Sequence, residues 1–441
     1  MCTHEGLPEG LARRRAAFFD AMAAACPSAI AVLPAAPVFP RNNDVEHEYR
    51  QDSDFFYVTG FDEPESVALL DAASRKMQLL VRPRDPEREV WDGPRAGVDG
   101  AKQRFGADDA WPIAELDDRL PTALQNHRRV YYRLGNNRRF DDRLLAAIDR
   151  VRSRQRTGVT PPTEIVDPGD ILHEMRLRKS PLELQAMRSA AAITGEAHEL
   201  AMRRARPGMH EYEVEALLLD TFRKHGSERP AYGSIVGSGP NACVLHYRKN
   251  DRRIEAGDLL LIDAGCEYGY YASDVTRTFP VSGSFSREQQ AIYELVLEAQ
   301  LEAIAATRPG VTLDDVHAVS VRVITRGLLS LGLLSGELED LVQTQAYKRL
   351  FMHRTSHWLG MDVHDVGAYF VDGRPRPLEP GMVLTIEPGI YIGPADDTVA
   401  ARWRGIGVRI EDDLVVTESG AEVLTAAIPK SVEDVRRASA A

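Results

Sequence analysis

The sequence lacks the cysteine pattern of disulfide-stabilised proteins and of zinc-thiolate proteins. Its 441 residues include only four cysteines, Cys2, Cys26, Cys243 and Cys266. No two of them have CxxC spacing, which would indicate a redox or zinc motif. Scattered cysteines in a chain of this length predict reduced thiols in a cytosolic protein.

Long apolar runs and long basic runs are missing as well. Asp20 and three prolines interrupt the Ala-rich residues 16–39, and no uncharged run reaches the ~20 residues that span a bilayer. The N-terminus lacks the apolar core of a signal peptide. A net charge of −12 disfavours binding to a nucleic-acid backbone. We therefore expect a cytoplasmic protein with no membrane or nucleic-acid partner.

The sequence does have enough apolar residues, 44%, for a sizeable core, and its length suggests two or three domains. Its first part alternates short apolar runs with helical stretches, which predicts an α/β domain. Residues 156–170 are rich in proline and glycine and predict a linker, so we place domains at 1–170 and 171–441. The predicted helices are Leu11–Ala25 and Asp142–Arg152, and the predicted strands are Ala29–Leu33, Phe55–Val58, Val67–Leu70, Met77–Val81 and Val130–Tyr132.

The second part contains one pattern twice. Capping boxes at Ser180–Glu183 and Ser286–Gln289 each begin a helix that ends at Arg-Pro-Gly, and another helix follows, from about Glu211 or Leu313. Each half later contains an apolar strand that ends in a carboxylate and glycine, at Gly257–Gly265 and Gly381–Gly389. The repeated order predicts two related halves from a duplication, although chance similarity between amphipathic helices is the simpler alternative.

Two of these carboxylates, Asp263 and Glu387, directly follow buried strands. A carboxylate there is costly unless it is paired, hydrogen-bonded or bound to a metal, although turn residues are also common at strand ends. Asp274 lies in an alternating segment that can form a hairpin with the first strand. A salt bridge from Asp274 to Arg277 is the alternative interpretation.

Further candidates come from the segment Gly407–Thr417. Arg409, Glu411 and Asp413 share one face of a predicted strand, so spacing alone does not choose between the two acids as ligands. A surface ion pair between Arg409 and Glu411 would also explain their spacing.

Several histidines lie near these acids in the chain. His353, His357 and His364 occur close together, without the HExxH spacing of a single-zinc protease helix. His246 is a fourth candidate, for which a buried, hydrogen-bonded role is an equally good interpretation.

Four carboxylates and one imidazole would form a hard, oxygen-rich ligand set. Such a set favours manganese, with cobalt, zinc or iron as alternatives. The carboxylate charge would be balanced by two divalent ions, which at about 3.5–4 Å apart can share a hydroxide.

The ensemble closely resembles the proline-specific aminopeptidases (aminopeptidase P, or Xaa-Pro aminopeptidase) of the pita-bread metallopeptidase family. The resemblance covers nearly the whole chain, and its long motifs occur in the family's order. The matching motifs are YRQDSDFFYVTGFDEPES (Tyr49–Ser66), IVGSGPNACVLHY (Ile235–Tyr247), GDLLLIDAGCEYGYYASDVTRTFPVSG (Gly257–Gly283), FMHRTSHWLGMDVHDVG (Phe351–Gly367), EPGMVLTIEPGIYI (Glu379–Ile392) and RGIGVRIEDD (Arg404–Asp413).

The resemblance implies a fold and a set of roles. It implies a creatinase-like N-terminal α/β domain, a C-terminal pita-bread domain of two pseudo-symmetric halves, and a homo-oligomer, dimer or tetramer. The implied ligands of two divalent metal ions, most readily Mn²⁺ with Zn²⁺ or Co²⁺ as alternatives, are Asp263, Asp274, His357, Glu387 and Glu411. Glu387 would also act as general base, His246 and His364 would bind substrate and steady the intermediate, and His353 would line the proline pocket. Arg409 would support activity, and Trp91 would reach the site from the N-terminal domain.

The implied activity is hydrolysis of the N-terminal Xaa-Pro bond of peptides. A prolidase, which cleaves only Xaa-Pro dipeptides, is the nearest alternative. A non-catalytic peptide- or histone-binding relative and a metal-free creatinase-type hydrolase are disfavoured, because all five ligand positions hold competent residues. Arg354 replaces the family's usual glycine near the proline pocket, and we hypothesise that it alters substrate preference.

Overall fold

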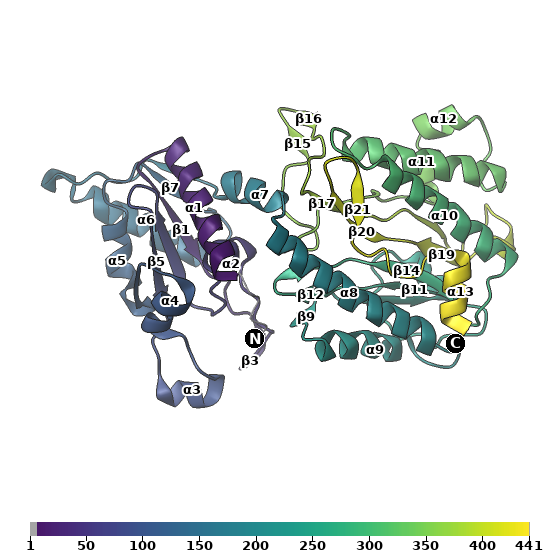
Figure 1. Cartoon of the computed structure of the whole chain (residues 1–441), viewed down its shortest axis with the longest axis horizontal. Helices are drawn as coiled ribbons and strands as arrows, with labels where there is room; N and C mark the ends of the chain where they lie inside the picture. Colours follow the sequence, from purple (N-terminus) through teal and green to yellow (C-terminus); the bar gives the residue numbers. More distant parts are fainter. Residues whose placement is uncertain (1–6, 441) are drawn as a thin grey trace. The chain divides into compact units, whose positions relative to one another are not determined.

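The computed structural model describes residues 7–440, which divide into two compact units between Met175 and Arg176 (Figure 1). This division falls within helix α7 (Gly169–Leu177), and the boundary predicted after residue 170 stays a prediction. No helix of the described residues is both long and apolar enough to cross a membrane. Cys26, Cys243 and Cys266 are free thiols, and Cys2 lies outside the described residues.

The N-terminal unit is built on a six-stranded mixed sheet with the order β6-β5-β4-β1-β7-β8. The neighbours β1, β4 and β5 are antiparallel, while β6, β7 and β8 add parallel pairs. Apolar side chains of the sheet pack against α5 and α6 in one buried core. The strands are β1 (Ala29–Pro34), β4 (Val67–Asp71), β5 (Lys76–Val81), β6 (Asp109–Pro112), β7 (Arg129–Tyr131) and β8 (Glu164–Val166), with a separate ribbon of β2 (Pro40–Asn42) and β3 (Val45–Glu46); the helices are α1 (Leu7–Ala25), α2 (Ser53–Thr59), α3 (Pro86–Asp92), α4 (Gly97–Phe105), α5 (Leu116–Ala123) and α6 (Arg138–Arg152).

Two predictions for this unit were wrong. The run Phe55–Val58 is not a strand but part of helix α2. The Asp52 side chain accepts a hydrogen bond from the Phe55 N–H at the start of the helix, and Gly60 ends it at φ 67°. Because every residue of α2 is buried, its apolar run has no helical periodicity to read. Within the predicted linker 156–170, β8 pairs with β7, so this stretch contributes an edge strand to the sheet.

The C-terminal unit confirms the predicted helix pairs. Helices α8 (Pro181–Arg204) and α10 (Arg287–Ala306) begin with the predicted capping boxes at Ser180 and Ser286. Each is followed by a partner helix, α9 (Glu211–Lys224) or α11 (Leu313–Ser330). Figure 1 shows α8 and α9 on one side of the strands, and α10 and α11 on the other. One large apolar core joins all four helices to the strands between them.

The strands of this unit repeat one arrangement. In the first half, β11 (Leu259–Asp263) lies between β10 (Ile235–Ser238) and β14 (Thr276–Pro280), antiparallel to both. In the second half, β17 (Val383–Ile386) pairs with β20 (Asp412–Val416), and residues 355–359 run along its other edge.

The two halves also match in register. Asp263 pairs with Ile235, and the Glu387 N–H correspondingly donates to the Thr355 carbonyl at 2.8 Å. The two carboxylates therefore occupy equivalent positions, as the duplication predicted. The remaining strands and α-helices of this unit are β9 (Arg229–Pro230), β12 (Cys266–Tyr268), β13 (Tyr271–Ala272), β15 (Phe370–Val371), β16 (Arg374–Pro375), β18 (Gly389–Ile392), β19 (Ile406–Arg409), β21 (Ala421–Val423), α12 (Leu338–Gln343) and α13 (Val432–Ala440).

Candidate metal centre

The five predicted ligands lie on strand ends and turns of the two halves of the C-terminal unit. Asp263 ends β11, and Asp274 lies in the turn before β14. In the second half, Glu387 follows β17, and His357 lies on the segment along the edge of β17. Glu411 lies between β19 and β20. Residues far apart in the sequence are thus carried to the place where the two halves meet.

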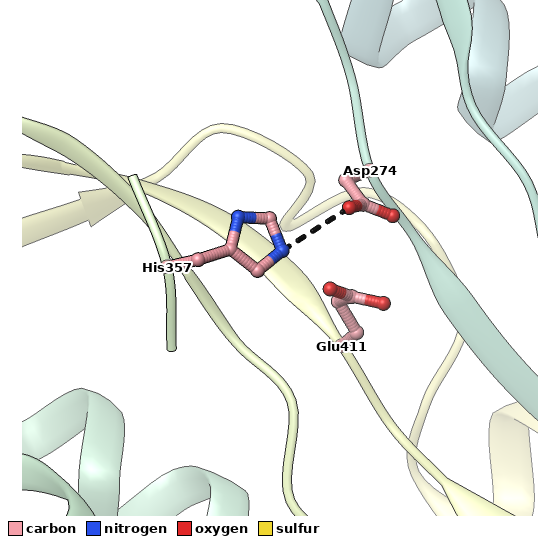
Figure 2. Close-up of side chains that lie close together, drawn as sticks. All are labelled: Asp274, His357 and Glu411. Atoms are coloured by element: carbon pink, nitrogen blue, oxygen red, sulfur yellow. Dashed lines mark ion pairs between the residues drawn. The ribbon is translucent and has the colours of Figure 1, made fainter. Parts of the chain in front are cut away.

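Three of these side chains converge closely, as Figure 2 shows. Asp274, His357 and Glu411 each offer a ligand atom, and these atoms all lie within 4.8 Å of one another. The Nε2 atom of His357 is 3.4 Å from Asp274 Oδ2 and 3.6 Å from Glu387 Oε1. Glu411 therefore lies beside Asp274, and the His357 imidazole lies between Asp274 and Glu387.

Tyr232 connects the fifth candidate to this group. Its hydroxyl donates to Asp263 Oδ1 at 2.5 Å and also hydrogen-bonds to Asp274 Oδ1. Burial and the charges of Asp263 and Asp274 raise the pKa of Tyr232 well above its usual value, so the phenol keeps its proton. Sequence reasoning missed Tyr232. A buried tyrosine hydroxyl needs a hydrogen-bond partner, but the sequence does not indicate which residue that partner is.

The imidazole of His357 is oriented toward the carboxylates. Its Nδ1 lies 2.9 Å from the Trp358 carbonyl oxygen, which can only accept, so Nδ1 donates and Nε2 faces Asp274 and Glu387. Burial disfavours the charged ring, but the hydrogen bond to Asp274 and the charges of Glu387 and Asp274 outweigh it and raise the pKa of His357 to about 9. The neighbouring carboxylates therefore stabilise positive charge at Nε2 of His357.

Arg409 and His357 compensate only part of the carboxylate charge. Burial and the charges of Asp274 and Asp263 raise the pKa of Glu387 to about 7, although His357 and Arg409 oppose the shift. Burial, followed by the charges of Asp274, Glu387 and Asp263, raises the pKa of Glu411 well above its usual value. Buried acids that repel one another are stabilised by cations. The donor set, with its oxygen majority and one oriented imidazole, is suited to divalent metal ions.

Arg409 is buried behind this cluster. Its guanidinium donates to Asp263 Oδ2 at 2.6 Å, to Thr276 Oγ1 at 3.1 Å and to the Tyr391 hydroxyl at 2.9 Å. Thr276 in turn donates to Glu411 Oε2 at 2.6 Å. Arg409 therefore orients candidate ligands from both halves, and the alternative of a surface pair with Glu411 is wrong.

The contacts of Arg277 and Asp413 bear on the other two alternative interpretations. Arg277 pairs with Asp412 at 2.7 Å, both fully buried, and not with Asp274. Asp413 accepts from Ser273 Oγ at 2.7 Å and from the Asp274 N–H at 3.1 Å, so it supports the Asp274 turn from outside the cluster.

Two of the other predicted histidines, His353 and His364, lie close to the cluster. His353 Nε2 is 2.8 Å from the Tyr391 hydroxyl, and its Nδ1 is 3.7 Å from Glu387 Oε2. The His364 ring is exposed and stands 4.4 Å from the His357 ring, centroid to centroid. His246 is exposed, so its alternative as a buried histidine is wrong. Trp91 belongs to the N-terminal unit, where it is 85% exposed on α3, and its role stays a prediction.

Comparison with known families decides the class of this site. The family model described as metallopeptidase family M24 matches residues 185–418, which carry all five candidate ligands. The chain belongs to metallopeptidase family M24. The aminopeptidase P N-terminal domain matches residues 11–131, so the M24 enzyme has the two-part organisation that the resemblance implied.

Relatives of this M24 enzyme are similar over nearly its whole length. The Xaa-Pro aminopeptidase of Escherichia coli is 45% identical over 426 residues, which cover 96% of each chain. The solved structure of aminopeptidase PepP from Pseudomonas aeruginosa has a TM-score of 0.96 at 55% identity, covering 98% of both chains. Zinc-substituted E. coli aminopeptidase P in complex with product has a TM-score of 0.95 at 43% identity, also covering 98% of both chains.

These findings confirm the recognition made from motifs. The chain is an aminopeptidase P-type metallopeptidase with an α/β N-terminal domain and a C-terminal pita-bread domain. The family and the clustered donors also support divalent metal ions as its cofactors.

Proposed function

We propose that the enzyme uses two divalent metal ions to hydrolyse the bond between the first residue of a peptide and a proline in second position. The observation that carries this proposal is the convergence of Asp274, His357 and Glu411. Glu387 Oε1 lies 3.6 Å from His357 Nε2, and Asp263 is linked to Asp274 through the Tyr232 hydroxyl. The Escherichia coli relative named above is an Xaa-Pro aminopeptidase, which supports the substrate class. Peptides with proline second are thus the proposed partners.

The contacts support a division of the ligands between two ions. Asp274 contacts Tyr232, which also bonds Asp263, and on its other side it contacts His357, which reaches Glu387. Asp274, with Glu411 beside it, is therefore placed to serve both ions. Mn²⁺ suits this donor set best, with Zn²⁺ or Co²⁺ as alternatives. When bound, the ions would polarise the substrate carbonyl and lower the pKa of a water molecule.

The family resemblance supports the remaining roles. Glu387 would accept the proton of the attacking water, because its carboxylate belongs to the cluster and lies 3.6 Å from His357 Nε2. The exposed His246 and His364 would bind the substrate, and His353 would line the proline pocket. The role of Trp91 in substrate binding stays a prediction. Arg409 would hold Asp263 and Thr276 in place.

The chemistry of the substrate explains why a dedicated site is needed. An Xaa-Pro bond has no N–H to donate and carries a ring on its nitrogen. Peptidases that bind that N–H therefore lose a contact and meet a clash. We propose that the site works on this bond in a cytoplasmic homo-oligomer, dimer or tetramer.

The nearest alternative, a strict dipeptidase, makes a different prediction. We expect the enzyme to release the first residue from a tripeptide such as Xaa-Pro-Pro as well as from longer peptides. Product formation from Xaa-Pro-Pro and from Xaa-Pro can be followed by chromatography at equal concentrations. Cleavage of the dipeptide alone would identify a prolidase and contradict the aminopeptidase proposal.

Arg354 gives a test of substrate preference. Its guanidinium pairs with Asp314 in the first turn of α11, and its carbonyl oxygen accepts from His353 Nδ1 at 2.8 Å. We expect Arg354→Gly to change the relative kcat/KM values across a panel of Xaa-Pro peptides while leaving activity in place. Arg349→Gln, which alters another arginine of the same segment, is the control. An unchanged profile for Arg354→Gly would disprove the hypothesis.

A further inference from the structure

Glu211 is a fully buried carboxylate outside the metal centre, at the first position of α9. A buried carboxylate is costly unless donors surround it. Its Oε1 accepts from the Ser238 N–H and the Ser238 hydroxyl, both at 2.7 Å, and from Asn241 Nδ2 at 3.1 Å. Its Oε2 accepts from the Tyr247 hydroxyl at 2.8 Å and from the Arg252 N–H at 2.9 Å. Both oxygens are thus fully engaged.

All these donors belong to one segment, residues 238–252, which begins at the last residue of β10 and contains His246. We call this segment the His246 loop. Ser238 and Arg252 are its two ends, and Tyr247 is the residue next to His246. The Glu211 N–H also donates to the Arg252 carbonyl at 3.0 Å. One side chain on a helix therefore fixes both ends and the middle of a loop whose histidine faces solvent.

Two other contacts hold the same loop against β10 and β19. Asn250, buried with a left-handed φ of 49°, accepts from the Val236 N–H at 3.0 Å and donates to the Ser234 carbonyl at 2.9 Å. Ala242 packs so closely on β19 that a Cβ on Gly407 would lie 2.2 Å from its carbonyl oxygen. This strand ends in Arg409. Because the loop packs closely against the strand, it has little freedom to shift relative to Arg409.

We propose that Glu211 is a positioning residue for His246, acting through the His246 loop to place the imidazole over the substrate. The inference rests on the substrate-binding role of His246 in the proposed function. A reacting group displaced by about 1 Å can cost ~100-fold in rate, so the position of this loop matters to catalysis. A cap for α9 alone would need none of the contacts to Tyr247 or Arg252.

Glu211→Gln tests this with a minimal change in shape. Glutamine has one acceptor oxygen, whereas the two loop ends donate their N–H groups to different oxygens of Glu211. In either orientation of the amide, one backbone N–H at an end of the loop loses its acceptor. We expect kcat/KM for an Xaa-Pro-Xaa peptide to fall ~10- to 100-fold, with the bound metal content unchanged.

A double-mutant cycle with His246→Ala separates positioning from a structural role. If Glu211 acts through His246, then Glu211→Gln should change kcat/KM less than about threefold in the His246→Ala background. An equal fall in both backgrounds, or no fall in the wild-type background, would overturn the proposal. Glu213→Gln is the matched control, since Glu213 caps the same helix through the His210 N–H and is half exposed. It should keep wild-type kcat/KM.

A second variant keeps the test usable if Glu211→Gln does not fold. Tyr247→Phe removes only one donor to Glu211, next to His246, and should lower kcat/KM ~3- to 10-fold in the wild-type background alone. If His246→Ala itself retains wild-type kcat/KM, then the proposed role of His246 is wrong and the inference falls with it. If the wild-type enzyme cleaves no Xaa-Pro peptide, the proposed function itself fails, which is a separate result.

Discussion

Replacing Glu387 with glutamine should lower kcat for an Xaa-Pro-Xaa peptide by ~10²–10⁴-fold, the range expected for loss of a general base. Glutamine keeps the size of the side chain but can neither accept the proton nor supply negative charge to a metal ion. The assay is steady-state kinetics at saturating peptide and metal.

Because Glu387 is also a proposed ligand, metal content should be measured on the same samples. If raising the metal concentration restores kcat, then the loss came from metal binding and the proposed role as base is wrong. The control is Glu379→Gln, which alters a half-exposed acid paired with Arg178 shortly before Glu387 in the chain. That variant should keep wild-type kcat.

Replacing Asp274 with asparagine should remove metal and activity together. Asp274 contacts Tyr232 on one side and His357 on the other, so the amide would weaken both metal positions at once. Loss of an outer-shell partner already costs up to ~100-fold in affinity or activity, and loss of a shared ligand should exceed that. We expect elemental analysis of the dialysed variant to find fewer than two metal ions per chain, with kcat/KM reduced by more than ~100-fold.

Asp220→Asn is the control for Asp274→Asn, because Asp220 is an exposed acid on α9 paired with Lys224. It should change neither metal content nor kcat/KM. Full metal content in Asp274→Asn would show that this side chain is not a ligand. Retained activity with one ion per chain would show that the chemistry does not need a second ion.

Much of the site could be predicted from sequence because the duplication places equivalent residues at equivalent points. Asp263 and Glu387 each follow an apolar strand, and the pairings Ile235 with Asp263 and Thr355 with Glu387 show that the two strand ends match. The helix boundaries were predictable for a local reason, since Ser180 and Ser286 form capping boxes within their own first turns.

Spacing failed where the backbone departs from regular structure. Glu411 and Asp413 would share a face in an unbroken strand, but β19 ends at Arg409 and β20 begins at Asp412. The bend between the strands turns Glu411 into the cluster and leaves Asp413 to bond Ser273 and the Asp274 N–H. Only the family resemblance distinguished the two acids before the structure did.

Tertiary burial accounts for the other gaps. Tyr232 and Glu211 are remote in sequence from the groups they bond, and nothing local marks either as buried among carboxylates or loop donors. The run Phe55–Val58 was wrongly predicted as a strand, because a short helix and a strand that are both fully buried give the same apolar run in the sequence. The environments of such residues are set by the packing of segments that are distant in the sequence, and local sequence patterns do not encode this packing.

The most direct test of the central claim is metal dependence of Xaa-Pro cleavage. The purified enzyme should be assayed on Xaa-Pro-Pro before chelation, after dialysis against a chelator, and during titration with Mn²⁺. The account predicts that chelation abolishes release of the first residue and that activity returns as two ions bind per chain. Undiminished cleavage by enzyme shown by elemental analysis to be metal-free would contradict it.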